Sequence, residues 1–357
     1  MRFFVLACHC VAAALLTAGA AHAANDVSIR IGDWILRPHY GEQKDKKQKA
    51  KWLERCTAQQ TNADKIAMIF SLDSHYMWTL ELANPSWNFP TGSKFDVSFG
   101  SREGGYFRQR VAALDAQLVR VLLPDSVSSF EAIRRLFKLE MVAGGLTTQF
   151  DLAYANPVLL ALTQCVTKYG TTAKNKAAVA AWLKSSIGPA AEASSDPAIL
   201  KETADLAREI ITEGEIAKAT ALKPDEVPNG MSGDTVWKVA DNLLTISVLP
   251  KDEVPAEIGD LNDLIVGGDA QKCRGDFFAG AMLDVVESLT VARAYTNCRT
   301  QQAETATYYF AIPRKSGGLY LLKTIATGVE VTPIGDRTIK DLDAKVRGVI
   351  TAALAKL

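Results

Sequence analysis

Hydrophobic and polar residues alternate along several short segments between residues 24 and 169. Alternation with a period of two is typical of β-strands that bury one face. Turn residues separate these segments, and Gly144-Gly145 forms the centre of a predicted hairpin. We therefore expect an antiparallel sheet with strands in VSIRIGDWIL (27–36), DKIAMIFSL (64–72), YMWTLELA (76–83), KFDVSF (94–99), AQLVRVLL (116–123) and the two arms of KLEMVAGGLTTQFDL (138–152).

Two helices are expected to cover this sheet. Ser128 stands three residues before Glu131, which is a capping-box pattern and predicts a helix start. Asn156-Pro157 predicts a second helix start, because asparagine is a good N-cap residue and proline suits the first helical turn. Gly170 is the expected end of that helix. Residues 24–169 are therefore predicted to form one α+β domain.

The pattern changes after residue 169. Residues 170–233 are rich in alanine, glutamate and lysine, and their helical periodicity predicts a helical connector. Residues 234–357 return to strand patterns. CRGDFFAGAML and LTVARAYTNCRT predict paired strands, ATYYFAIPRKSGGLYLLKTIA predicts a hairpin, and TVWKVADNLLTISVL fits a helix or a strand. The final segment, IKDLDAKVRGVITAALAKL, predicts an amphipathic helix.

The first residues of the chain predict export. Arg2 precedes an apolar run that ends in Ala21-His22-Ala23, which is the pattern of a secretory signal peptide (1–23) cut after Ala23. The apolar run is shorter than the ~20 residues that a membrane span needs. No later segment is apolar enough to cross a bilayer. We expect a periplasmic or secreted mature chain.

Four cysteines follow the predicted cleavage site: Cys56, Cys165, Cys273 and Cys298. An even number of cysteines in an exported chain favours disulfides, and four cysteines allow three connectivities. We prefer Cys56–Cys165 and Cys273–Cys298, because each pair then falls within one predicted domain. The predicted fold class is α+β, with two domains that each combine an antiparallel sheet, packed helices and a disulfide, joined by the helical connector.

Charge and motifs argue against several classes of function. Lysine and arginine total 40, as do aspartate and glutamate, so no net charge attracts nucleic acid. The chain has no G-x-x-x-x-G-K-[ST] or G-x-G-x-x-G motif for nucleotides and no C-x-x-C or H-x-x-x-H spacing for zinc. Gly144-Gly145 and Gly267-Gly268 are expected to be turn glycines. We predict no cofactor and no metal ion.

The stretch SLDSHYMWTLELANPSW (71–87) holds a compact Asp–Ser–His group. A serine hydrolase needs serine, histidine and acid in contact, and only His39 and His75 follow the predicted cleavage site. The chain lacks the G-x-S-x-G elbow. Cys56 and Cys298 each begin a Cys-x-x-Gln-Gln, strand, four polar residues, strand pattern. We therefore predict a hairpin turn at His75 and assign no catalytic residue.

Two segments are predicted surface contacts. Five lysines lie close together (Lys44, Lys46, Lys47, Lys49 and Lys51) and can meet an anionic lipid or wall polymer, although a solvated helix face is the simpler interpretation. Tyr106 and Phe107 follow Gly104-Gly105 in SREGGYF, which is a candidate exposed loop. Trp87 is expected to fill the end of a strand rather than to bind a partner.

The phrases WTLELANPSW with TGSKFDVSF, FDLAYANPVLLALTQC, and CRGDFFAG with VARAYTNC resemble exported proteobacterial proteins of unknown function with cysteine-bracketed domains. Where those proteins often carry Gly-Ser, this chain has Tyr154-Ala155-Asn156-Pro157. The matching residues are structural. The resemblance therefore implies a periplasmic address and a disulfide pattern, but no reaction.

We expect a non-enzymatic binding or interaction protein of the cell envelope, whose partner is an unknown protein or envelope component. Two alternatives stay open: a periplasmic hydrolase without a recognisable motif, and an inhibitor or chaperone-like factor for a secreted partner. The hydrolase requires His39 or His75 beside a carboxylate and a serine in one pocket. The chaperone-like factor requires a contiguous exposed apolar patch.

Overall fold

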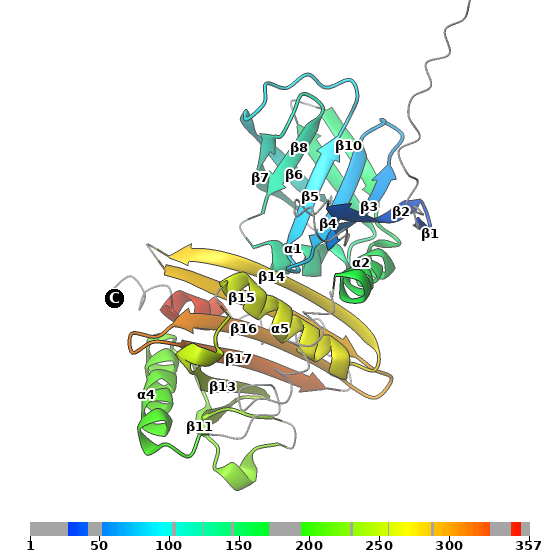
Figure 1. The fold of residues 1–357 in the computed structure, drawn as a ribbon. Coiled ribbons are helices and arrows are strands. Elements are labelled where there is room, and N and C mark those ends of the chain that lie inside the picture. Colours follow the sequence, from blue (N-terminus) through cyan, green and yellow to red (C-terminus); the bar gives the residue numbers. More distant parts are fainter. Residues whose placement is uncertain are drawn as a thin grey trace, which may run out of the picture.

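The computed structural model describes residues 28–41, 52–101, 105–123, 125–143, 146–170, 194–228, 231–255, 257–286, 289–328 and 344–350. Two antiparallel sheets, one of ten strands and one of seven, dominate the fold (Figure 1). The predicted α+β fold class is confirmed. The predicted signal peptide (1–23) and the lysine run (44–51) lie outside the described residues. No helix in the described ranges is long and apolar enough to cross a membrane.

The N-terminal sheet has the strand order β1-β2-β3-β4-β5-β8-β7-β6-β9-β10. Its strands are β1 (Ile29–Ile31), β2 (Trp34–Gly41), β3 (Trp52–Thr61), β4 (Ala67–Asp73), β5 (Trp78–Ala83), β6 (Lys94–Ser101), β7 (Gly105–Ala113), β8 (Leu118–Leu122), β9 (Lys138–Ala143) and β10 (Leu146–Asp151). The segment VSIRIGDWIL forms a hairpin rather than one strand, because Gly32 adopts a φ of 58° between β1 and β2. The expected loop at Tyr106 and Phe107 is wrong, since both residues lie in β7.

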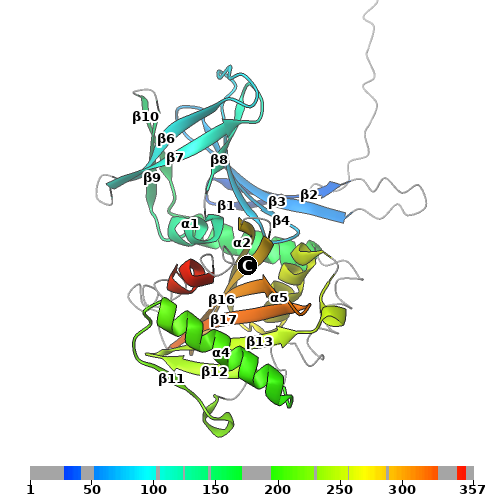
Figure 2. The same cartoon turned by 90° about the vertical axis from the view of Figure 1, so that its left-hand side faces the viewer.

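Helices α1 (Ser126–Ile133) and α2 (Ala155–Tyr169) lie between the two sheets (Figure 2). The predicted start of α1 at Ser128 is wrong. Asp125 is the N-cap residue, and its carboxylate accepts a hydrogen bond from the Ser128 N–H at 2.9 Å. Helix α2 begins one residue before Asn156, after Tyr154, whose side chain makes no capping hydrogen bond. Gly170 ends α2 as predicted.

The C-terminal sheet has the strand order β11-β12-β13-β17-β16-β15-β14. Its strands are β11 (Ala219–Ala221), β12 (Thr235–Val239), β13 (Asn242–Leu249), β14 (Asp276–Val286), β15 (Leu289–Arg299), β16 (Glu304–Pro313) and β17 (Leu319–Gly328), with short 3-10 turns η1 (Pro224–Glu226) and η2 (Lys251–Glu253). The ambiguous segment TVWKVADNLLTISVL is therefore a hairpin, β12–β13. The predicted β14–β15 and β16–β17 pairs are confirmed.

Helices cover both faces of the C-terminal sheet (Figure 1). Helix α5 (Ile258–Lys272) packs along β14 and β15 on one face. Helix α4 (Pro197–Glu213) and the helical residues 344–350 pack on the other face, around Leu244, Phe310 and Leu322. Helix α5 contradicts the expectation of turn glycines at Gly267-Gly268. Gly267 and Gly268 lie inside α5, and Gly268 is buried.

Part of the predicted connector belongs to this sheet. Helix α4 confirms the helical pattern, and its buried residues Ala207 and Ile210 join the apolar cluster on the C-terminal sheet. Strand β11 pairs with β12 at the sheet edge. Residues 171–193 lie outside the described residues, so the predicted domain boundaries stay a prediction.

Both preferred disulfides are present. Cys56 in β3 is bonded to Cys165 in α2, and Cys273, just after α5, is bonded to Cys298 in β15. Each bond ties a helix to the sheet on which it packs. The two Cys-x-x-Gln-Gln patterns differ in structure. The first lies wholly within β3, whereas the glutamines of the second fall between β15 and β16.

An aromatic stack joins the two sheets. Trp78 stacks on Phe130 of α1 and on Phe278 of β14, with ring centroids 4.7 and 5.7 Å apart. The Trp78 indole N–H also donates to the Ala279 carbonyl at 2.9 Å. Residues of both sheets and of α1, α2 and α5 belong to one buried apolar cluster. The contact between the sheets is therefore a continuous core rather than a polar surface contact.

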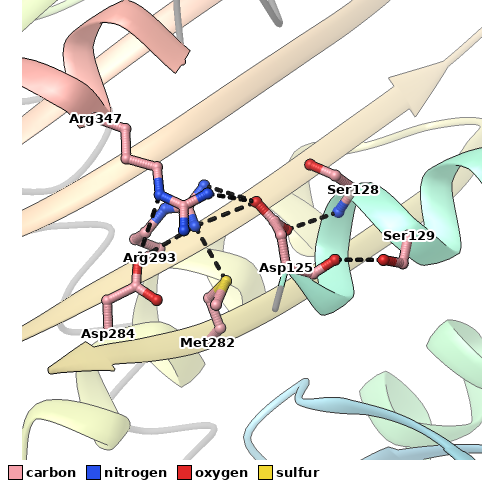
Figure 3. A network of polar contacts seen from close by, with 7 residues as sticks. All are labelled: Asp125, Ser128, Ser129, Met282, Asp284, Arg293 and Arg347. Atoms are coloured by element: carbon pink, nitrogen blue, oxygen red, sulfur yellow. Dashed lines mark hydrogen bonds and ion pairs between the residues drawn. The ribbon is translucent and has the colours of Figure 1, made fainter. Parts of the chain in front are cut away.

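A buried arginine fixes α1 to the C-terminal sheet (Figure 3). The Arg293 side chain is 5% exposed and lies 3.3 Å from both Asp125 and Asp284. Arg347 donates to the same Asp125 oxygen at 3.1 Å. Asp125 thus caps α1 with one oxygen and receives two guanidinium groups with the other. A buried charge needs such partners, because its desolvation is costly.

We expect Asp125→Asn to lower the free energy of unfolding by about 2 kcal/mol, because asparagine keeps the helix cap but leaves Arg293 short of negative charge. Asp125→Ala also removes the cap and should cost roughly 1 kcal/mol more. Urea unfolding checks both values. Asp284→Asn is the matched control, since it leaves the cap and the Asp125 ion pairs in place and should cost less. Equal stability of wild type and Asp125→Asn would contradict this role of Asp125.

Candidate binding site between the two sheets

A cavity of about 800 Å³ opens where the N-terminal sheet meets β14. Strands β3, β4, β5, β8 and β14, the β4–β5 turn and the start of α1 supply its walls. The walls combine apolar side chains with polar and charged side chains. They comprise Met77, Trp78, Val121, Leu122, Leu123, Ala281, Met282 and Leu283, together with Glu54, Arg55, Ser71, Asp73, Ser74, His75, Thr79, Arg120 and Ser126.

His75 lies in the turn between β4 and β5, as predicted. One oxygen of Asp73 accepts the backbone N–H groups of His75 and Met77, both at 2.9 Å. Tyr76 completes the turn with a φ of 60°, a backbone conformation that residues other than glycine seldom adopt. Asp73 thus shapes the turn and directs the His75 ring towards α5.

The His75 ring pairs with a carboxylate from a distant part of the chain. His75 Nδ1 lies 3.3 Å from Asp263 of α5. The hydrogen bond with Asp263 raises the pKa of His75 to about 9, with further contributions from the charges of Asp263, Asp73 and Asp260. His75 is therefore a cation at neutral pH, and the pair forms a charged contact between the N-terminal sheet and α5.

This charge state does not suit a serine hydrolase. A general base must be neutral at the working pH before it can accept a proton. Among the described residues, no serine hydroxyl donates to either ring nitrogen of His75, and His39 pairs with Thr57 on β2 and β3 instead. Ser71 lines the cavity, but its buried hydroxyl has no partner among the described residues.

One group in the described ranges has the donor spacing of a metal site. Atoms of His75, Asp260 and Asp263 lie within 4.8 Å of one another. Histidine must be neutral to bind a metal, so an ion at this place would have to displace the proton that Asp263 stabilises. The protonated ring itself occupies the position of a cation beside Asp263.

Strand β14 is the edge strand of the C-terminal sheet (Figure 1), and its residues 281–283 line the cavity. The Ala281 N–H donates to the Tyr76 carbonyl at 2.7 Å, and Met77 forms a parallel bridge with Ala281. In an antiparallel strand, every second residue directs its N–H and C=O groups to the same side. Leu283 and Val285 therefore direct theirs away from β15, beyond the end of the cover. We call these two residues the β14 edge.

The β14 edge is apolar as well as open. Leu283 is 38% exposed and Val285 is 71% exposed. Leu122, at the end of β8, is 37% exposed and lines the same cavity. None of the described residues forms a backbone hydrogen bond with Leu283 or Val285 on this side. The sequence pattern does not distinguish these residues, because edge position depends on the order of strands in the sheet.

The predicted surface contacts do not meet at this cavity. The lysine run is outside the described residues. Tyr106 and Phe107 lie in β7, whose residues do not line the cavity. Trp87 is partly buried and stacks near Phe89 at the edge of a separate apolar hollow of about 480 Å³. Its expected role in filling the end of a strand is consistent with this position.

Comparison with known proteins adds no family. No family model matches the chain, and no curated protein is similar to it at a significant level. Among solved structures, the chain matches the crystal structure of the di-domain ARO/CYC StfQ from the steffimycin biosynthetic pathway with 12% identity and a TM-score of 0.14, over 91% of this chain and 82% of that chain. A likeness this weak carries no argument about fold or function.

The His75–Asp263 pair predicts a pH-dependent term in stability. The pKa of His75 is about 9 in the folded protein, against an ordinary value of 6.5. The contribution of the His75–Asp263 pair to the free energy of unfolding should be complete below pH 6.5 and should disappear as the pH rises through 9. Because the His75 side chain is 44% exposed, we expect the free energy of unfolding to fall by only about 1 kcal/mol over this pH range.

Unfolding at pH 6 and pH 9.5 tests this expectation. The difference in stability between wild type and His75→Gln should shrink over that range. His39→Gln is the matched control and should keep the wild-type pH dependence. A difference between wild type and His75→Gln that stays constant from pH 6 to 9.5 would show that the ion pair contributes nothing.

Proposed function

We propose that this protein binds an extended polypeptide segment, which adds as a strand to the β14 edge and places its side chains in the cavity. The observation that carries this proposal is the backbone of Leu283 and Val285, which no described residue pairs on the side away from β15, beside their exposed side chains. Exposed edge strands pair readily with another chain, and most proteins protect them with lysine, proline or a covering segment. Strand β14 contains no lysine or proline, and none of the segments that the structure describes pairs with the β14 edge.

The walls of the cavity favour a peptide with alternating apolar side chains. A strand added to β14 directs every second side chain to the same face. Leu122 and Leu283, which line the cavity, offer apolar contacts to such side chains. A charged residue in the cavity wall supports selectivity for particular peptide sequences. The Arg55 Nε atom is buried and has no hydrogen-bond partner among the described residues. An acidic side chain or a terminal carboxylate on the peptide would satisfy it.

We further propose that the protein acts outside the cytoplasm, in the periplasm or after secretion. Two disulfides support this location, because disulfide bonds persist in oxidising compartments. The signal-peptide pattern supports it from the sequence. We also infer two domains, 24–169 and a C-terminal domain that includes residues 234–357 together with α4 and β11 from the predicted connector 170–233. The separate apolar cluster on the outer face of the C-terminal sheet supports a second folding unit.

A chaperone-like factor for a secreted partner is the second candidate. The exposed apolar β14 edge favours it, since strand addition through backbone groups tolerates many sequences. The two candidates differ in selectivity. A binding protein with one partner should select peptides with a shared pattern, whereas a chaperone-like factor should retain many unrelated apolar segments.

A proline substitution provides the sharpest test. Peptides are first selected from a displayed random library against the intact protein, and the dissociation constant of a synthetic selected peptide is measured by fluorescence anisotropy. Val285→Pro removes an N–H that points away from β15, so the fold should tolerate it. Affinity for the peptide should fall about tenfold or more, because one hydrogen bond is lost and the proline ring blocks the edge.

Val285→Thr is the matched control, because it keeps the N–H and the branched shape. It should bind within about threefold of wild type if backbone pairing dominates. Thermal unfolding of each variant checks that the fold is intact. Selected peptides that bind Val285→Pro as tightly as wild type would refute the β14 edge as the site.

A further inference from the structure

A second cavity lies within the C-terminal half, between α5 and the sheet. It measures about 220 Å³. Lys323 of β17, Tyr309 of β16 and Asp269 of α5 line it, together with hydroxyl groups of Ser232, Thr296, Thr305 and Thr307. The exposed side chain of Lys272 also borders the cavity, so small molecules can enter the cavity from solvent.

The sheet register places these groups side by side. Tyr309 and Lys323 are directly opposite each other in the β16–β17 pair, so their side chains share one face. Thr296 and Thr307 are opposite each other in the β15–β16 pair. Because strands β15, β16 and β17 are consecutive, the lysine, the phenol and the hydroxyl groups lie under the same helix.

Asp269 is firmly held, whereas Lys323 is not. One Asp269 oxygen accepts hydrogen bonds from the Tyr309 hydroxyl at 2.5 Å and from the Thr296 hydroxyl at 2.6 Å. Lys323 is only 5% exposed. Among the described residues, no oxygen accepts a hydrogen bond from its amine or lies within ion-pair distance of it.

Such an amine is unusual for a structural lysine. Buried lysines are normally paired with a carboxylate, since an isolated ammonium group is costly to desolvate. Burial lowers the pKa of Lys323 to about 8, the largest cause being desolvation. A substantial part of Lys323 is thus neutral near pH 7.5, and a neutral amine is a nucleophile.

We propose that Lys323 is a reactive amine that binds small aldehydes reversibly as an imine. The cavity provides space for the aldehyde beside the amine, and its hydroxyl groups can hold the carbonyl oxygen. This site is separate from the β14 edge and does not depend on peptide binding.

The reaction balances without any further reagent. The Lys323 nitrogen attacks the carbonyl carbon, and the resulting carbinolamine holds the former carbonyl oxygen as a hydroxyl group. The nitrogen then loses a proton, the hydroxyl group gains one and leaves as water, and a C=N bond forms. Asp269, whose charge acts on Lys323 more strongly than any other, stabilises the positive charge that the nitrogen carries during this step.

Reductive trapping in the intact, disulfide-bonded protein tests the proposal. Acetaldehyde or glyoxylate is added at pH 7.5 with sodium cyanoborohydride, and peptide mapping by mass spectrometry locates the alkylated lysines. The neutral fraction of a lysine with a pKa near 8 is roughly two hundredfold that of an ordinary lysine at this pH. We expect Lys323 to carry at least tenfold more label than Lys272, which serves as the internal control within the same molecule.

The pH profile separates a reactive site from accidental labelling. The rate at Lys323 should level off above pH 8, whereas the rate at Lys272 should keep rising past pH 9.5. The neutral probe and the anionic probe distinguish an aldehyde pocket from simple attraction of an anion, since acetaldehyde should label Lys323 as well. Labelling confined to Lys272 and other exposed lysines, with Lys323 unmodified by both aldehydes, would overturn the proposal.

Discussion

The outer edge of β14 is the constraint on which the arrangement of the two sheets depends. An edge strand leaves backbone N–H and C=O groups without partners in its own sheet. The N-terminal sheet supplies these partners in one place, where Tyr76 accepts the Ala281 N–H and Trp78 donates to the Ala279 carbonyl. Beyond Ala281 no described residue pairs with this edge, so the outward backbone groups of Leu283 and Val285 have no partner in the described part of the chain. The same strand therefore joins the two sheets and offers a surface for a partner.

Ion pairs fix the relative position of the two sheets at this junction. Asp125 caps α1 and holds Arg293 of β15 and Arg347 of the last described helix. His75 and Asp263 make a second contact at the other side of the cavity. The apolar stack around Trp78 provides contact area, whereas these ionic contacts specify how α1, the β4–β5 turn and α5 are placed. The cavity is held open between two fixed walls, which suits a site that receives a ligand without a large rearrangement.

Most strand positions and both disulfides could be predicted from the sequence because they follow local alternation and cysteine placement, but β7 was missed because Gly104-Gly105 resembles a loop. Helix α5 was missed because Gly267-Gly268 resembles a turn locally, whereas the packing of α5 on β15 is a tertiary contact that no local pattern reveals. The cap of α1 was misplaced because Ser128 and Glu131 fit a local pattern, whereas Asp125 is favoured by distant arginines. The His75 turn was predicted, but its partner Asp263 comes from a helix that the pattern did not reveal. A lysine inside the apolar strand LYLLKTIATG is a signal that could have drawn attention to Lys323.

Amide hydrogen exchange at single-residue resolution tests the central claim, strand addition at β14, most directly. In the free protein, the Leu283 and Val285 amides should exchange rapidly, and the Ala281 amide should be protected by Tyr76. A saturating selected peptide should slow exchange at Leu283 and Val285 by about tenfold or more, while Ala281 changes little. Saturation with the peptide that leaves the Leu283 and Val285 amides exchanging at their free rates would contradict the account.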